Sequence, residues 1–355
     1  MTTLRLPGLI DVHVHTRDPG QTHKEDWSTA TASALAGGVT TILAMPNTTP
    51  VVGDRASLDV AARAAASGAR CDYALYAAAT AANAATVRSI AGQVVGLKMY
   101  LDQTFGDLRL PDLDAWWAHL ANWPPSSPVV VHAEGRSLPG VLLMAEWLRR
   151  PIHFCHVSRA DEIVLIARAK DRGLPVTCEA TPHHLLLDAG DAVRLGPFGG
   201  VRPPLSDPAD VAALWAHLDV IDCFATDHAP HTAAEKASAT PPPGLPGVET
   251  MLPLLLTAVD KGRITFDQVL DRLVANPRRI FGLPEQPDTR VEVDPDDRWV
   301  IRSSALHTRC DWTPYEGREV RGRVVRVVLR GETVFENATV TGAAGAGRNL
   351  REEKP

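Results

Sequence analysis

Short apolar runs alternate with longer amphipathic segments along most of the chain. The short runs have the length and composition of buried strands and lie at residues 8–15, 39–46, 71–78, 96–101, 128–134, 151–157, 175–182 and 221–227. The longer segments are rich in alanine and leucine, predict helices, and lie at residues 23–36, 54–67, 81–90, 111–121, 138–149, 160–172, 207–218 and 249–259. Strands that alternate with helices in this way predict an α/β fold, a (β/α)8 TIM barrel. A doubly wound open sheet has the same alternation of strands and helices, so the alternation alone does not distinguish the two folds.

The pattern changes after about residue 284. Residues 291–293, 299–301 and 317–335 are β-type, and the last stretch contains strands bounded by glycine. We therefore expect a barrel formed by residues 8–284 and a small accessory β subdomain formed by residues 1–7 and 285–340. Residues 341–355 are rich in glycine, arginine and glutamate, which predicts a tail or linker.

Composition and charge narrow the class of protein. A chain of 355 residues with 45% hydrophobic and 22% charged residues is typical of a soluble globular protein. The formal net charge of −6 argues against a nucleic-acid partner. Five cysteines, mostly within apolar runs, indicate buried thiols in a reducing compartment. We find no secretory leader and no apolar run long enough for a membrane span, so we expect a cytoplasmic protein without a membrane partner.

Histidines and a carboxylate lie at the ends of several predicted strands. His13 and His15 share one face of the first strand, because side chains alternate along a strand with a period of two. His132 and His156 end two later strands, and Asp227 ends the last. A lone strand histidine is usually a satisfied core residue, but four of them with a carboxylate favour a metal site. Imidazole and carboxylate suit zinc, and barrel strands direct such residues to one mouth. This placement also favours the barrel over the open sheet.

Lys98 ends another predicted strand and poses a separate problem. A nearby metal ion would repel an ammonium group, and both desolvation and that charge favour the neutral amine. A neutral amine can take up carbon dioxide as a carbamate, whose two oxygens suffice to bridge two metals. A lysine paired with a carboxylate and a Schiff-base lysine are the alternatives that remain open.

Seven motifs together resemble the dihydroorotases of the amidohydrolase superfamily. They are DVHVHTRDPG (11–20), AMPNTTP (44–50), GLKMYL (96–101), VHAE (131–134), CHVSRA (155–160), CEATPHH (178–184) and ATDHAPHT (225–232). Further stretches, including THKEDW, LDQTFGDLRL, NPRRIFGLP and WTPYEG, are most similar to the dihydroorotase domain of the animal pyrimidine-synthesis multienzyme CAD. The similarity runs from about residue 6 to residue 329. It implies a zinc-dependent, reversible cyclisation of N-carbamoyl-L-aspartate to L-dihydroorotate and water in pyrimidine biosynthesis.

The resemblance also implies a metal centre of two zinc ions bridged by a carboxylated Lys98. The implied ligands are His13, His15, Lys98 and Asp227 for one zinc, and Lys98, His132 and His156 for the other. Asp227 would also be the catalytic acid and base. Cys155 and Glu179 match positions that hold an additional metal in the animal domain, and a core thiol and an ion-paired carboxylate are the alternative.

The expected substrate-binding residues follow from the shape of the substrate's carboxylate as well as from the resemblance. The free α-carboxylate of the implied substrate suits a bidentate arginine, and Arg17 lies two residues beyond the His13–His15 pair. The substrate-binding positions implied by the family are Arg17, Asn47, Arg202, His231, Pro243 and Gly244. Thr104 and Phe105 fall in a stretch that matches the family's flexible loop, which would cover bound substrate.

Two other functions remain open at this stage. A hydantoinase or dihydropyrimidinase would share the metal site but would not need the carboxylate-binding set. Some relatives of this fold are non-catalytic assembly modules, which typically lose metal ligands, whereas each expected position is filled here. The resemblance further implies a homodimer, and fusion or association with carbamoyl phosphate synthetase and aspartate transcarbamoylase.

Overall fold

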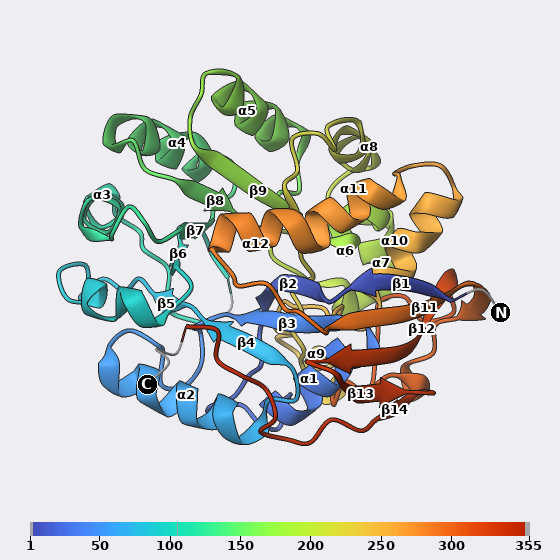
Figure 1. The fold of residues 1–355 in the computed structure, drawn as a ribbon. Helices are drawn as coiled ribbons and strands as arrows, with labels where there is room; N and C mark the ends of the chain where they lie inside the picture. Colours follow the sequence, from blue (N-terminus) through green and yellow to red (C-terminus); the bar gives the residue numbers. More distant parts are fainter. Residues whose placement is uncertain (1–2, 105, 352–355) are drawn as a thin grey trace.

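A closed barrel of parallel strands occupies the centre of the computed structural model, which describes residues 3–104 and 106–351 (Figure 1). Its strands are β2 (Leu9–Val14), β3 (Val39–Ala44), β4 (Asp72–Leu75), β5 (Ala77–Ala78), β6 (Leu97–Tyr100), β7 (Val129–His132), β8 (Ile152–Phe154), β9 (Val176–Ala180) and β10 (Cys223–Phe224). The predicted (β/α)8 barrel is confirmed. The single strand expected at residues 71–78 divides into β4, which pairs with β3, and β5, which pairs with β6.

The barrel closes between its first and last strands. The backbone N–H of His15 donates to the carbonyl of His228 at 2.8 Å. A second tie comes from the Asp11 carboxylate in β2, which accepts from the Thr226 backbone N–H at 3.1 Å. Residues at the carboxyl ends of β2 and β10 are therefore held next to each other although more than 200 positions separate them.

Seven of the predicted helices are present and surround the barrel. They are α1 (Trp27–Ala36), α2 (Arg55–Gly68), α3 (Leu113–Asn122), α4 (Ser137–Leu148), α5 (Ala160–Asp171), α8 (Pro208–Ala216) and α10 (Met251–Asp260). The first two begin with an aspartate cap, because Asp26 and Asp54 accept the backbone N–H three residues later. These caps set where each helix leaves its preceding loop.

The helix expected at residues 81–90 is replaced by turns and the short 3-10 helix η1 (Val87–Gln93). Asn83 accounts for the difference. Its side chain accepts from the Thr80 backbone N–H at 2.8 Å and donates to the Ala78 and Gly53 carbonyls at 2.9 and 3.0 Å. Such side-chain bonds compete with helical backbone bonds, so the alanine-rich composition does not decide the structure here.

Several short elements were not predicted. They are α6 (Pro182–Leu186), α7 (Ala189–Leu195), η2 (Gly196–Gly199), α9 (Ala233–Lys236), α11 (Phe266–Leu270), the π-helical turn η3 (Asp271–Ala275), α12 (Asn276–Phe281) and η4 (Ser303–Ala305). Most are shorter than two helical turns, which leaves too few residues for a periodic signal. None of the helices within residues 3–104 and 106–351 is long and apolar enough to cross a bilayer.

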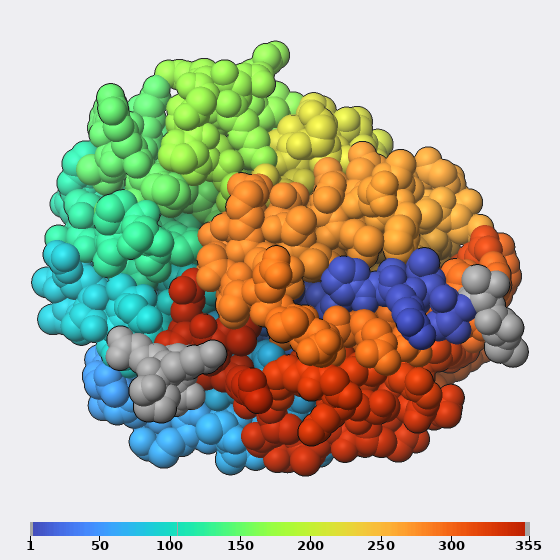
Figure 2. All heavy atoms as spheres, in the orientation of Figure 1, coloured from blue at the N-terminus to red at the C-terminus, as the bar shows by residue number. Residues whose placement is uncertain are grey.

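The expected accessory β sheet is also confirmed, and both ends of the chain contribute to it. Its strands are β1 (Leu4–Pro7), β11 (Arg290–Val300), β12 (Glu319–Leu329), β13 (Glu332–Glu336) and β14 (Thr339–Val340), all antiparallel. In Figure 2 the blue N-terminal residues lie between orange and red segments, as the pairing of β1 with β11 requires.

Residues after β14 return to the barrel. The Tyr73 backbone N–H donates to the Arg348 carbonyl at 2.9 Å, and the Leu350 N–H donates to the Tyr73 carbonyl at 2.8 Å. This stretch belongs to the segment expected to form a tail or linker. Up to residue 351 it lies along β4 with regular backbone hydrogen bonds.

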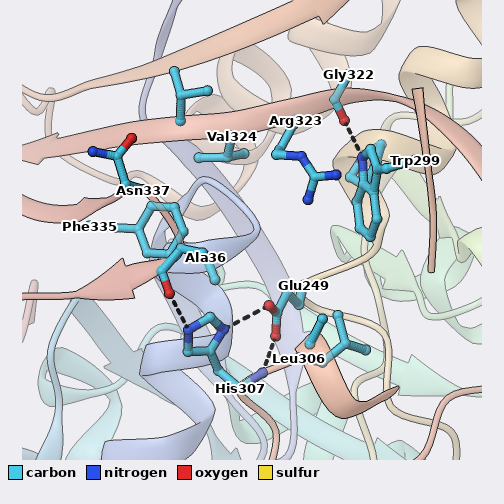
Figure 3. A pocket seen from close by; sticks show the side chains of 14 residues that line it. Ala36, Glu249, Trp299, Leu306, His307, Gly322, Arg323, Val324, Phe335 and Asn337 are labelled. Atoms are coloured by element: carbon cyan, nitrogen blue, oxygen red, sulfur yellow. Dashed lines mark hydrogen bonds and ion pairs between the residues drawn. The ribbon is translucent and has the colours of Figure 1, made fainter. Parts of the chain in front are cut away.

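A cavity of about 190 Å³ lies where the accessory sheet meets the barrel (Figure 3). His307 forms an ion pair with Glu249 on one side of it, with 2.8 Å between Nδ1 and Oε1. On another side the Arg323 guanidinium lies 4.4 Å from the centre of the Trp299 ring. Aromatic and aliphatic side chains, including Phe335, fill most of the remaining wall.

Candidate active site

His13 of β2, His15 just beyond this strand and the carboxylate that follows β10 converge at one point. Nε2 of His13 and Nε2 of His15 lie 3.2 and 3.0 Å from the same oxygen, Oδ1 of Asp227. All three side chains are buried. Burial alone would raise the pKa of the Asp227 carboxyl, but the His13 and His15 imidazoles hold it well below its usual range. These three ligand atoms lie close enough together to hold one metal ion.

Behind His13 lies a second buried carboxylate, Glu179 of β9. Its Oε1 is 2.5 Å from Nδ1 of His13, and its Oε2 is 3.1 Å from Nε2 of His153. Burial opposes ionisation, yet these two contacts lower the pKa of Glu179 to about 2. An ionised carboxylate at Nδ1 leaves Nε2 of His13 as the nitrogen that can bind a metal. His153 also lines a cavity of about 520 Å³ at the amino ends of β7 to β9.

A second group forms around the ends of β7 and β8. Nε2 of His132 lies 2.8 Å from Oε1 of Glu134, and Nδ1 of His132 lies 2.9 Å from Nε2 of His156. Because a carboxylate only accepts, His132 donates from Nε2 and keeps a lone pair on Nδ1. Within the described part of the chain, the buried Nδ1 of His156 has no hydrogen-bond partner. Lone pairs gathered in a buried site are the arrangement that a cation stabilises.

Lys98 lies between these two groups and is fully buried. Its Nζ is 2.7 Å from Sγ of Cys155 and 5.0 Å from the centre of the Tyr100 ring. Among residues 3–104 and 106–351, no carboxylate oxygen lies within ion-pairing distance of this amine. The alternative of a lysine paired with a carboxylate therefore finds no support in the described residues. A buried ammonium without a counter-ion is costly, and carbamate formation would remove that cost.

The donor set fits a metal centre. One group joins His13, His15 and Asp227, and another joins His13, Cys155 and His156, with the ligand atoms of each group within 4.8 Å of one another. Imidazole nitrogen, thiol sulfur and carboxylate oxygen are the ligands that zinc prefers. Cys155 therefore belongs to the cluster by position, and Glu179 contacts it through His13.

Three residues of this region hold a left-handed backbone without being glycine. Arg17, His156 and Asp227 have φ angles of 61°, 34° and 46°. Such conformations cost free energy for residues with a Cβ and are kept where the surroundings fix them. All three lie two or three residues beyond the end of a barrel strand, in the turns at the carboxyl ends of the strands.

A cleft next to the metal groups gathers the sequence-predicted substrate residues. It is lined by His15, Arg17, Asn47, Thr104, Val201, Arg202, Asp227, Ala229, Pro243 and Gly244. His231 lies directly behind Arg17, with 3.1 Å between Nε2 and Nη2. The remaining residue of the predicted set, Phe105, lies outside the described residues.

Asn47 connects the cleft to the metal group. Its Oδ1 lies 2.7 Å from Nδ1 of His15, so His15 can donate from Nδ1, and a cation bound between Nε2 and the Asp227 carboxylate would take the lone pair of Nε2. The amide nitrogen of Asn47 remains available to the cleft. One side chain thus orients a metal ligand and faces the space in which an anion would bind.

Sequence reasoning missed four residues that hold this site together. Asp11 bonds to both the His13 N–H and the Thr226 N–H, and so joins the two halves of the first metal group. Glu134 and His153 orient metal-group residues, as described above. Lys24 contacts His231 with 3.1 Å between Nζ and Nδ1. In the sequence, Asp11 is a third polar residue on the strand face of His13 and His15. No sequence pattern distinguishes the other three from ordinary surface or core residues.

Comparison with known sequences gives concordant results. Residues 4–104 match the model of the amidohydrolase family. The chain is 52% identical over 349 residues to the multifunctional protein CAD of Squalus acanthias, covering 98% of this chain and 16% of that protein. It is 34% identical over 361 residues to the dihydroorotase of Pyrococcus furiosus, covering 98% and 86%. The chain thus spans about a sixth of the length of the first and most of the second.

Solved structures show the same fold. The L-hydantoinase of Arthrobacter aurescens superposes with a TM-score of 0.92 at 24% identity, covering 98% of this chain and 89% of that one. The inactive dihydroorotase-like domain of the CAD-like multifunctional protein of Chaetomium thermophilum gives 0.85 at 30% identity, covering 99% and 100%. The chain is 34–37% identical to the dihydroorotases of three Pyrococcus species and covers 84–87% of their length, so it belongs to the dihydroorotase family of amidohydrolases.

Proposed function

We propose that the protein is a dihydroorotase, which interconverts N-carbamoyl-L-aspartate and L-dihydroorotate in pyrimidine biosynthesis. One observation carries the assignment. Two buried groups of potential metal ligands lie next to a cleft that is lined by two arginines, Arg17 and Arg202. The chemistry requires a metal centre beside an anion-binding wall, because both substrate and product carry a free α-carboxylate. Sequence identity to proteins named dihydroorotase supports the same function.

The residues would divide the reaction between binding and proton transfer. Arg17, Arg202 and the amide of Asn47 would hold the α-carboxylate and direct the ureido group toward Asp227. In ring closure, Oδ1 of Asp227 accepts the proton of the attacking ureido nitrogen, and in ring opening it returns a proton to that nitrogen. Two zinc ions, held by His13, His15, Asp227, His132, His156 and a carboxylated Lys98, would supply Lewis acidity at the carboxyl carbon.

A third metal at Cys155 and Glu179 is a separate proposal. Cys155 Sγ lies in one of the two metal groups, which supports it. Glu179, however, is engaged by His13 and His153, which supports the alternative of an ion-paired carboxylate. Metal analysis of the wild type and of Cys155→Ala distinguishes these: a loss of one equivalent indicates a third metal, and an unchanged content indicates a core thiol.

Substrate comparison tests the assignment. Purified protein loaded with zinc is offered N-carbamoyl-L-aspartate, L-dihydroorotate, dihydrouracil and hydantoin, and turnover is followed for each. We expect turnover of N-carbamoyl-L-aspartate and L-dihydroorotate. Dihydrouracil and hydantoin should show little turnover, because they have no carboxylate that Arg17 and Arg202 could bind. Preference for dihydrouracil would assign a dihydropyrimidinase, and metal binding without any turnover would assign a non-catalytic module.

We also propose that the chain works as part of a larger assembly. Identity to two multifunctional proteins, 52% and 50%, exceeds the 34–37% found for three Pyrococcus dihydroorotases. This supports fusion or association with carbamoyl phosphate synthetase and aspartate transcarbamoylase. The five buried free cysteines support a reducing, cytoplasmic location.

A homodimer is the proposed state of the barrel itself. Four large apolar side chains are exposed on the neighbouring helices α3 and α4, namely Leu113, Trp117, Leu143 and Trp147. Trp117 and Trp147 pack edge to face with ring centres 6.3 Å apart. A cluster of this kind is typical of a protein interface.

A further inference from the structure

His231 lies between two buried cationic side chains, directly behind the cleft residue Arg17. Nζ of Lys24 is 3.1 Å from its Nδ1, and Nη2 of Arg17 is 3.1 Å from its Nε2. The carbonyl oxygen of Pro243 is also 3.1 Å from Nε2. His231 and Lys24 are 0% and 5% exposed, so water does not replace these contacts.

The three contacts decide which nitrogen of His231 carries the proton. Ammonium and guanidinium groups only donate, and a carbonyl only accepts. With the proton on Nε2, Lys24 donates to the lone pair of Nδ1 and Nε2–H donates to Pro243, so two contacts are hydrogen bonds, and the third sets two donors, Nη2 of Arg17 and Nε2–H, against each other. With the proton on Nδ1, the contacts with Lys24 and with the Pro243 carbonyl both become repulsive, and only the bond from Arg17 is formed. The Nε2–H form is therefore the more stable tautomer.

The charge around the ring also disfavours the imidazolium. Burial lowers the pKa of His231, and the positive charges of Arg17, Lys24 and Lys236 lower it further. Glu235 is the one described carboxylate near the ring, and its Oε2 lies 3.9 Å from Nδ1. Its other oxygen, Oε1, is 3.3 Å from Nζ of Lys24, so its charge is shared with the lysine.

Glu235 in turn fixes the position of Lys24. It accepts from the Thr232 backbone N–H at 3.0 Å in the capping box of α9, and from Nε2 of His23 at 3.1 Å. The lysine ammonium is thereby held between a fixed carboxylate and Nδ1 of His231. A chain of contacts thus runs from the Thr232 cap through Glu235 and Lys24 to the ring.

We propose that Lys24 is a positioning residue that holds His231 as the neutral Nε2–H tautomer, so that His231 and Arg17 both donate to the substrate α-carboxylate. The proposal rests on the proposed dihydroorotase function for the identity of the anion. The tautomer matters because the opposite form would point a lone pair at that anion. Loss of one hydrogen bond to a charged group typically weakens binding about tenfold or more.

Nitrogen NMR of the zinc-loaded protein labelled with [15N]histidine tests the tautomer directly. The His231 signals are assigned by their loss in His231→Gln. We expect a protonated Nε2 and an unprotonated Nδ1 in the wild type from pH 6 to pH 9, and a mixture of tautomers in Lys24→Met. A protonated Nδ1 in the wild type overturns the proposal, and so does an unchanged tautomer in Lys24→Met.

Kinetics supply the second readout. In Lys24→Met the KM for N-carbamoyl-L-aspartate should rise about tenfold with kcat changed less than threefold, and Lys24→Arg should restore most of the loss. Lys170→Met is the matched control, since Lys170 pairs with Asp222 away from the cleft and its KM should not change. A KM in Lys24→Met that stays within twofold of the wild type contradicts the proposal.

The two hypotheses fail separately. A wild type that shows the expected tautomer without turning over either substrate contradicts the dihydroorotase function alone. An active wild type with the proton on Nδ1 contradicts the role of Lys24 alone.

Discussion

Oδ1 of Asp227 lies 3.0 Å from Nε2 of His15, across 212 positions of sequence. The proximity results from barrel closure, because the His15 N–H and the His228 carbonyl pair the strands that carry them. The carboxylate that would move the proton is thus fixed by the same bonds that complete the barrel.

Asp227→Asn should abolish turnover in both directions. The amide keeps the size of the side chain but cannot accept the proton of the ureido nitrogen, and proton transfer of this kind contributes about 10²–10⁴ in rate. Steady-state kinetics in both directions provide the measurement, with the circular dichroism spectrum as control for the fold. Activity within tenfold of the wild type would remove Asp227 from the role of acid and base.

Lys98→Ala should deplete zinc and remove activity, since it deletes the two carbamate oxygens proposed to bridge the metals. Lys98→Arg should fail as well, because a guanidinium stays protonated and cannot take up carbon dioxide. Zinc per chain, measured by atomic emission, gives the result independently of turnover. Partial recovery of Lys98→Ala with acetate or propionate at high zinc would support a missing carboxylate. Full zinc content in Lys98→Arg would falsify the bridging role.

His153→Gln should lower the affinity for the metal at His13 without removing any ligand. His153 contacts Oε2 of Glu179, whose Oε1 orients His13, and loss of such a supporting contact typically costs about 10–100-fold in metal affinity. Competition with a chromogenic chelator measures this affinity, and thermal unfolding of the metal-free protein serves as control. Unchanged affinity would show that Glu179 holds its position without His153.

His307→Gln should reduce stability in a manner that depends on pH. The hydrogen bond to Glu249 raises the pKa of His307, while burial raises the pKa of Glu249, so the folded protein binds protons more tightly at both groups. The contribution of His307 is therefore complete below about pH 6.5 and is lost as the pH rises through its folded pKa. Urea unfolding should show a loss of about 1 kcal/mol in His307→Gln at pH 6. At pH 9 the two proteins should differ little, and an equal loss at both values would contradict the ion pair.

Trp147→Glu should convert the proposed dimer into a monomer. A charge placed on the patch of α3 and α4 would have to be buried without a partner in an interface centred there. Sedimentation equilibrium gives the mass. Val193→Glu, at a residue that is 83% exposed on α7, provides a matched control. If the wild type is already monomeric, the homodimer proposal fails.

The strand and helix pattern carried enough information to predict the barrel because its period matches buried parallel strands and their covering helices. Prediction failed where side chains act on local backbone, as Asn83 does when it replaces a helix with turns. The site shows the same division. Strand-end histidines were visible because their spacing is local, and the resemblance supplied Arg202 and Asn47.

Contacts that depend on distant parts of the chain could not be predicted. Lys24 meets His231 across 207 positions, and His153 of β8 meets Glu179 of the paired strand β9 across 26 positions. By residue type alone, Lys24 cannot be distinguished from a solvated surface lysine, and His153 cannot be distinguished from a core histidine. These contacts form only when the strands have paired and the barrel is closed.

The line of contacts from His153 through Glu179 to His13 has a further consequence. In barrels of this class, residues at the amino ends of the strands are generally assigned to stability and those at the carboxyl ends to chemistry. Here a side chain that borders a cavity at the amino ends is separated from a metal-group histidine by one carboxylate. Substitutions at the amino ends of these strands, such as His153→Gln, are therefore expected to weaken metal binding at the carboxyl ends while leaving the residues of the cleft in place.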